Sequence, residues 1–195
     1  MRRNCKKLAV FLISTCLLTG CGNPMNKMKE STVYLNKHGV VESLSVEAFD
    51  KAYYDENELK NFIDEEIKAQ QTLRGEESLS LEEFEVKEEK ATLRVKYKTV
   101  EDYTEFTDTK FESGKYKADI LSDDQTLIQV ETKEEVDKAN VEAEGLSYIK
   151  IQDPDGIQLL IDGSISYYSK GMEFVEKNLI KVPAGQECII LYQQK

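Results

Sequence analysis

The chain has 195 residues and carries 26 Lys and Arg against 37 Asp and Glu, a formal net charge of −11 at pH 7. Proteins that bind nucleic acid need a basic surface, so this charge balance argues against such a partner. Hydrophobic residues make up 40% of the chain, which excludes a disordered protein and suits one domain or two small ones.

The first twenty residues have the layout of a secretory signal. Four cations and no acid stand within residues 1–7, and an apolar run covers residues 8–18. A helix needs about 20 apolar residues to span a bilayer, so this run is too short for an ordinary transmembrane anchor. It has the length of a signal-peptide core, and we expect residues 1–20 to be removed.

The segment Leu18-Thr19-Gly20-Cys21 follows this run. It resembles the lipobox of bacterial lipoproteins. The resemblance implies cleavage before Cys21, a diacylglyceryl thioether on its sulfur, and a protein anchored at the outer face of the cytoplasmic membrane. Two acyl chains give stable anchoring where one does not. The alternative is a general secretory signal with a cysteine nearby by chance.

Processing would change both the charge and the cysteine inventory. Loss of residues 1–20 removes four cations and shifts the formal net charge from −11 to −15. Cys5 and Cys16 leave with the signal, and lipid occupies Cys21, so Cys188 remains without a disulfide partner. Its apolar neighbours predict a buried, unreactive thiol. Residues 21–30 are predicted to be a tether that reaches roughly 30 Å when extended.

Residues 31–140 are predicted to form an α+β domain. A hairpin is expected over residues 32–46, with its turn at 36–39. Asp55 and Glu58 form a capping-box pattern before an amphipathic helix that ends near Gly75. Strict alternation predicts a strand over 91–98, with a partner just before it. Less regular patterns predict a helix over 102–111, a hairpin of 115–121 with 126–130, and a short helix over 132–139.

Residues 141–195 are predicted to be an all-β subdomain. The expected strands cover 148–152, 157–161, 165–168, 179–182 and 188–192, separated by turns rich in Gly, Pro and Asp. Short strands with tight turns are typical of a meander, a sandwich or a small barrel. The fold class expected for the whole chain is therefore α+β, with an all-β C-terminal part.

Two longer stretches, residues 33–67 and 154–167, resemble small uncharacterised lipoproteins of Gram-positive anaerobes. The resemblance implies that the protein is located at the cell envelope and shares the fold of these lipoproteins. It implies no functional residue other than Cys21.

The residues that could carry catalysis are few. His38 is the only histidine and lies in the predicted hairpin turn, where a solvated polar role is favoured over a place in a catalytic triad. Ser147 and Lys150 match the Ser-x-x-Lys pattern of penicillin-binding proteins. A strand would point these two side chains to opposite faces, so we interpret the match as chance.

Acidic residues offer two further hypotheses. Asp153, Asp155 and Gly156 resemble the start of a calcium loop, but a Pro-Asp-Gly hairpin turn explains them better. A pair of carboxylates could cleave glycans, and Tyr53-Tyr54 or Tyr167-Tyr168 could then hold sugars, although packing within the fold is the favoured explanation.

The alternating strand carries a basic ladder, Arg94, Lys96 and Lys98. It could receive an anionic partner. Pairing with the acidic residues Asp64, Glu65 and Glu66 of the preceding helix, or plain solvation, is favoured.

These observations lead to one expectation and two alternatives. We expect a lipid-anchored protein with a non-catalytic binding or accessory role, whose partners are the membrane and an envelope protein or wall component. No catalytic residue, metal site or cofactor is predicted. The first alternative is an acidic-residue hydrolase acting on wall glycan or peptide. The second alternative is a receptor that captures a small solute. It is the least favoured, because such receptors bind their solute between two lobes and this chain is short for two lobes.

Overall fold

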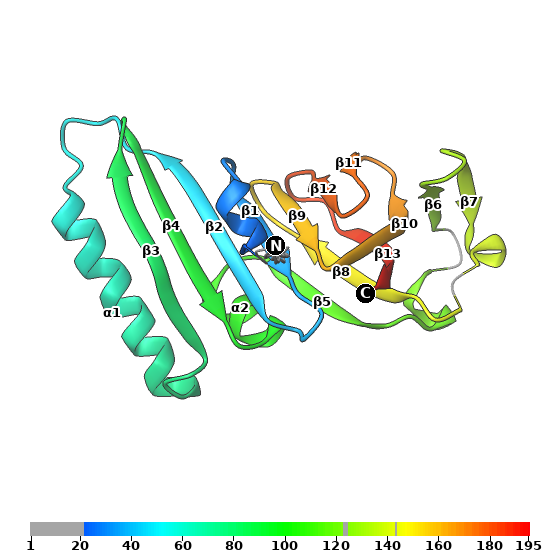
Figure 1. Cartoon of the computed structure of the whole chain (residues 1–195), viewed down its shortest axis with the longest axis horizontal. Coiled ribbons are helices and arrows are strands. Elements are labelled where there is room, and N and C mark those ends of the chain that lie inside the picture. Colours follow the sequence, from blue (N-terminus) through cyan, green and yellow to red (C-terminus); the bar gives the residue numbers. More distant parts are fainter. Residues whose placement is uncertain (1–21, 123–124, 143) are drawn as a thin grey trace, which may run out of the picture.

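The structure is a computed structural model that describes residues 22–122, 125–142 and 144–195. Cys21, the predicted lipidation site, lies outside the described residues. Within them the chain forms two α-helices and thirteen strands arranged in two sheets (Figure 1). The predicted α+β class is confirmed. Neither helix in the described ranges is long and apolar enough to cross a membrane.

The larger sheet has seven strands in the order β11-β12-β9-β1-β2-β4-β3. β1 and β9 run parallel, and the other neighbouring strands run antiparallel. The strands are β1 (Thr32–Leu35), β2 (Val41–Ala48), β3 (Leu79–Lys87), β4 (Lys90–Tyr97), β9 (Ile157–Ile161), β11 (Glu173–Glu176) and β12 (Leu179–Val182). α1 (Glu56–Arg74) connects β2 to β3 and lies beside β3 at one end of the molecule (Figure 1).

The smaller sheet has six antiparallel strands in the order β5-β8-β13-β10-β6-β7. The strands are β5 (Lys110–Lys115), β6 (Thr126–Gln129), β7 (Glu135–Asp137), β8 (Ser147–Gln152), β10 (Gly163–Ser169) and β13 (Cys188–Gln194). α2 (Val100–Phe106) leads into this sheet from β4, and three short 3-10 helices complete the fold: η1 (Pro24–Lys27), η2 (Ala118–Ile120) and η3 (Lys138–Asn140).

One hydrophobic core joins the two sheets. It takes Val33 and Leu35 from β1, Ile149 and Ile151 from β8, and Ile190 from β13. Each sheet contains strands from both sides of residue 141. The inner face of the larger sheet is thus covered by the smaller sheet near β1 and by α1 near β3, because Ile63 and Ile67 of α1 belong to the same core.

The strongest local patterns are confirmed. β1 and β2 form the predicted hairpin, and β3 and β4 pair as expected. Asp55 caps α1, because its carboxylate accepts hydrogen bonds from the backbone N–H groups of Asn57 and Glu58 at 2.8 and 3.0 Å. The helix ends at Gly75, whose φ of +104° suits glycine. All five strands predicted after residue 141 are present.

The predicted helix over 102–111 is wrong in its extent. α2 starts earlier, after Thr99, whose hydroxyl accepts a hydrogen bond from the Asp102 backbone N–H. It ends at Phe106, and β5 then pairs with β8. Phe111 is buried in the core as a strand residue. The spacing of Phe111 from the apolar residues before it is compatible with a helix or with a strand. Pairing between distant strands determines that it is a strand residue.

Two further predicted elements are wrong. Residues 115–121 do not pair with 126–130, because β6 is bordered by β10 and β7. The helix predicted over 132–139 is replaced by a turn, β7 and η3. The Thr132 hydroxyl does accept a backbone N–H, from Glu134. However, Lys133 has a φ of +61°, which breaks a right-handed helix at its first turn.

Residues 22–30 differ from the extended tether that their polarity suggested. Met25, in η1, is 1% exposed and packs with Leu44, Leu160 and Leu179 on the outer face of the larger sheet. The Asn23 side chain donates to both carboxylate oxygens of Glu42 at 3.0 and 2.8 Å. The chain is therefore held against the sheet from the second residue after Cys21.

Candidate functional site

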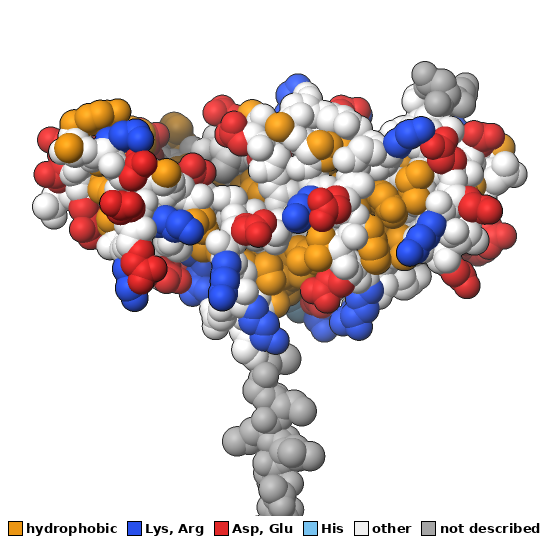
Figure 2. Space-filling model, turned by 90° about the horizontal axis from the view of Figure 1, so that it is seen from above, with side chains coloured by type: hydrophobic (Ala, Val, Ile, Leu, Met, Phe, Trp, Pro, Cys, Tyr) orange, Lys and Arg blue, Asp and Glu red, His pale blue; other side chains and the backbone are white. Residues whose placement is uncertain are grey.

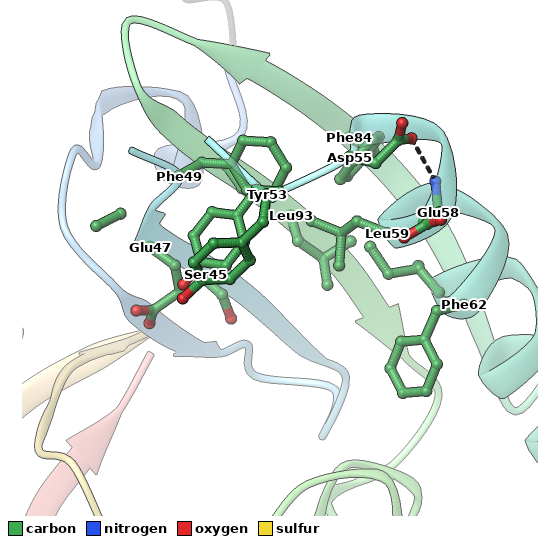
Figure 3. A pocket seen from close by; sticks show the side chains of 14 residues that line it. Ser45, Glu47, Phe49, Tyr53, Asp55, Glu58, Leu59, Phe62, Phe84 and Leu93 are labelled. Atoms are coloured by element: carbon green, nitrogen blue, oxygen red, sulfur yellow. Dashed lines mark hydrogen bonds between the residues drawn. The ribbon is translucent and has the colours of Figure 1, made fainter. Parts of the chain in front are cut away.

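An apolar groove of about 500 Å³ opens between α1 and the inner face of the larger sheet. Its floor is formed by residues of three strands, Ser45, Phe84, Ala91 and Leu93. Figure 3 shows Leu59 and Phe62 of α1 on one side of this groove and Phe49 and Tyr53 on the other. The volume lies within the range of ordinary small-ligand sites.

The groove exists because α1 covers the sheet incompletely. Ile63 and Ile67 are the buried residues of this helix, whereas the ring of Phe62 on the same helix is 59% exposed. On the inner face β2 presents Ser45 to the groove, where a fully covered sheet would carry a large apolar residue. An exposed phenylalanine beside uncovered sheet indicates a binding surface rather than a core.

Aromatic residues of the segment between β2 and α1 form the opposite wall. The Tyr54 ring lies 5.0 Å from the Phe49 ring and 5.0 Å from the Tyr53 ring, measured between centroids. The Phe49 backbone N–H donates to the Glu89 carbonyl at 2.7 Å, which ties this segment to the β3–β4 turn. Tyr53 itself is 78% exposed. This wall of the groove is thus a cluster of three aromatic rings. The segment that carries them is held in place at its first residue, Phe49.

The rim of the groove is acidic. Glu47, Asp55 and Glu58 line it, and none of the lining residues is Lys or Arg. The groove combines an apolar floor with negative charge at its edge. Such a surface favours an apolar occupant that carries positive charge.

A second hollow, of about 260 Å³, adjoins the groove and shares Ser45, Glu47 and Leu93 with it. Asp153 is buried here. One carboxylate oxygen accepts the Thr109 hydroxyl at 2.6 Å, and the other accepts the Asp155 backbone N–H at 3.1 Å. Both oxygens accept hydrogen bonds within the fold, so Asp153 shapes the predicted turn and joins it to Thr109, the residue before β5. Gly156 closes that turn with a φ of +79°.

Two buried tyrosines continue this polar network. The Tyr103 hydroxyl donates to Thr109 at 3.1 Å, and the Tyr97 hydroxyl lies 3.4 Å from the Ser43 hydroxyl. Burial raises the pKa of Tyr103 to about 12 and raises the pKa of Tyr97 further. Both rings therefore stay neutral and hydrogen-bonded, as a structural support beneath the hollow.

The structure does not bring together the residues that the sequence analysis weighed for catalysis and set aside. His38 is exposed in the β1–β2 turn, where its backbone N–H donates to Asn36 Oδ1 at 2.8 Å. Ser147 and Lys150 stand on opposite faces of β8: Lys115 donates to the Ser147 hydroxyl, and Lys150 pairs with Glu187. Among the described residues, no group of three or more His, Cys, Asp or Glu side chains could hold a metal ion.

The predicted partners of the basic ladder are wrong. Arg94 lies 3.4 Å from Glu42 and 3.6 Å from Glu83, and Lys98 pairs with Glu77 at 3.0 Å. The acidic residues of α1 cannot meet this ladder, because the helix covers the opposite face of the sheet. Asp64, one of them, pairs with Lys60.

The two tyrosine pairs have different places. Tyr167 is buried, and its hydroxyl accepts the Glu142 backbone N–H at 3.3 Å, while Tyr168 stacks on Phe174. Packing explains both, as the sequence suggested. Tyr53 and Tyr54 instead line the groove. The sequence signal that could have located the groove is this aromatic pair next to a helix whose apolar stripe includes Phe62.

Cys188 is completely buried on β13. Burial, with a smaller contribution from Glu187, raises the pKa of its thiol to about 11. The unfolded thiol titrates near about 8.5. The neutral thiol therefore favours the folded state most at pH values below the pKa of the unfolded thiol. Its contribution to the free energy of unfolding is lost as the pH rises from that value toward 11.

We expect Cys188 of the folded protein to react with a maleimide at pH 8 far more slowly than the same residue in denaturant, because reaction needs an exposed thiolate. The measurement is the labelling rate by mass spectrometry, with Cys188→Ser as background. Equal rates in the folded and denatured protein would contradict the buried position.

Comparison of the chain with protein-family models, with curated proteins and with solved structures finds no match in any of the three.

Proposed function

We propose that this protein is a lipid-anchored, non-catalytic binding module of the cell envelope that captures an apolar, basic peptide segment of another envelope protein. The anchor is Cys21 at the outer face of the cytoplasmic membrane. The binding site is the groove between α1 and the larger sheet. The observation that carries the proposal is the exposed Phe62 ring beside an apolar floor and an acidic rim.

The chemistry of the groove selects this occupant. Apolar side chains of a peptide would displace water from Phe62, Leu59 and Tyr53, which supplies most of the affinity. Lys or Arg residues flanking them would meet Glu47 and Glu58 at the rim. An acidic peptide with the same apolar residues would be repelled, so charge determines specificity.

The test uses two fluorescein-labelled peptides that share the same leucines and differ only in carrying Lys or Glu between them. We expect the Lys peptide to bind in a fluorescence anisotropy titration, and the Glu peptide to bind at least about tenfold more weakly. The Phe62→Ala variant is expected to lose about tenfold in affinity for the Lys peptide, because aromatic anchors dominate such sites.

Leu73→Ala is the matched control, because Leu73 lies on the same helix, is 80% exposed and does not line the groove. Both variants should retain the thermal stability of the parent within experimental error, since surface truncations usually cost less than about 0.5 kcal/mol. Equal affinity for the two peptides, or equal losses of affinity in Phe62→Ala and Leu73→Ala, would contradict the proposal.

The alternative, an acidic hydrolase, would use carboxylates of the second hollow. Three of the residues that line this hollow are Asp108, Asp153 and Asp155. Both carboxylate oxygens of Asp153 already accept hydrogen bonds within the fold. An Asp155→Asn variant separates the two proposals. Binding of the Lys peptide would persist in this variant under our proposal, whereas release of wall fragments that depends on Asp155 would favour the hydrolase.

A further inference from the structure

The short segment after Cys21 is built onto one face of the larger sheet. Asn23 caps η1 by accepting the Met25 N–H at 3.0 Å, and its amide nitrogen also holds Glu42. Asn26 accepts from the Arg94 guanidinium at 2.7 Å. With Met25 buried in the same place, the chain next to Cys21 has a defined position on the protein.

This face is opposite to the groove. Arg94 points to η1, whereas Leu93 and Ala91, its neighbours in β4, line the groove. Successive residues of a strand point to opposite faces, so the sheet itself separates the attachment point from the groove.

The η1 face also carries a cluster of lysines in an otherwise acidic protein. Lys90 and Lys96 share the face of Arg94 because they lie at even spacing in β4, and Lys87 is opposite Lys90 in the register. Lys27 and Lys29 come from η1 and the residues after it. Among the described residues, none of these five lysines has an ion pair, whereas Glu42 and Glu83 of the same face are engaged by Arg94. Glu83 and Glu85 are exposed acids on this face, and the exposed Glu30 follows Lys29.

The lysines border a hollow of about 420 Å³ beside η1, in which Lys29, Lys90 and Arg94 lie around Met25 and Met28. Figure 2 shows Lys and Arg side chains along the lower edge of the molecule, with Asp and Glu side chains among them, and a group of apolar side chains at the upper left, at the end that carries α1. The lysines and this apolar group thus lie at different places on the surface.

We infer that the η1 face of the larger sheet, with Lys27, Lys29, Lys87, Lys90 and Lys96, rests on the anionic lipid surface of the membrane, so that the groove opens away from it. The inference rests on the proposed lipid anchor, which brings this face within one residue of the bilayer. Each lysine near an anionic surface strengthens association by about fivefold. The orientation leaves the groove accessible to a partner approaching from outside.

The absence of Trp from the chain allows single Trp reporters. We would place one at Met28→Trp on the η1 face and another at Phe62→Trp in the groove. The chain from Cys21 to Lys195, which contains every core residue described above, is joined through the Cys21 thiol to a maleimide phospholipid in vesicles of phosphatidylcholine and phosphatidylglycerol. Brominated phosphatidylcholine then quenches any Trp close to the bilayer.

We expect several-fold stronger quenching of the reporter at position 28 than of the reporter at position 62. The difference should shrink in high salt, because surface charge is screened within about 10 Å at 0.1 M ionic strength. In the triple variant K27Q/K29Q/K90Q, most of the difference in quenching between positions 28 and 62 should disappear. K68Q/K110Q/K133Q, which removes three exposed lysines outside this face, should keep it.

Equal quenching at the two positions, or equal effects of the two triple variants, would overturn the inference. Chemical attachment of the lipid makes this result independent of whether cells lipidate Cys21 and of whether the groove binds peptide. Failure of the proposed function would therefore appear in the labelling and anisotropy experiments and leave this measurement unaffected.

Discussion

Cys21→Ala is expected to abolish lipid attachment and to release the protein from the membrane fraction. The thioether needs the cysteine sulfur, and stable anchoring of this kind takes two acyl chains. The measurement is metabolic labelling with an alkyne fatty acid, followed by gel fluorescence and by detergent phase partitioning of the cell extract. The wild-type protein should carry the label and enter the detergent phase.

Cys16→Ala is the matched control. It replaces a cysteine of the same signal segment, preserves an apolar side chain and lies outside the lipobox. It should be labelled like the wild type. Label that persists on Cys21→Ala, or a wild-type protein that takes up none, would show that the resemblance of residues 18–21 to a lipobox is misleading.

The second large effect is expected in the shared core. Ile190 is 0% exposed on β13, paired with Ile149 of β8 and with Tyr168 of β10. We expect Ile190→Ala to lower the free energy of unfolding by about 3 kcal/mol, because it removes buried methyl groups and leaves a cavity. The measurement is urea unfolding followed by far-UV and near-UV circular dichroism.

Because one core joins strands from residues 31–140 and 141–195, the two spectroscopic signals should change together in a single transition in the parent and the variant. Ile190→Val should cost only about 1 kcal/mol. Val175→Ala, at an exposed position of β11, should cost less than about 0.5 kcal/mol. Two separated transitions, only one of which shifts in Ile190→Ala, would show that the regions do not share a core.

The fold elements that could be predicted are those specified within a few residues. The Asp55 cap, the Gly75 end of α1 and the alternation in β4 each depend on local hydrogen bonding or on side-chain period. Two of the three wrong elements, residues 102–111 and 132–139, had apolar spacing or capping residues compatible with more than one structure. Pairing of β5 with β8 and of β7 with β6 decided them.

The aromatic pair Tyr53-Tyr54 could have pointed to the groove, but the sequence could not show which part of α1 is left uncovered. Phe62, Ile63 and Ile67 form one apolar stripe in the sequence, but Ile63 and Ile67 meet the core and Phe62 does not. Phe62 and Ile63 are consecutive residues, so which of them is covered depends on how α1 is rotated where it lies against β3. Local periodicity carries no information about that rotation.

The sequence by itself determined the acidic charge and the α+β class, and it is the source of the predicted signal segment and of the predicted modification at Cys21, because all of these depend on composition and short-range pattern. Only the tertiary structure decided that Leu44 points away from Val33, toward Met25, and that η1 and the groove occupy opposite faces of one sheet. The physical reason is that register and sheet order arise from contacts between residues far apart in the chain, and these contacts determine which face each side chain occupies.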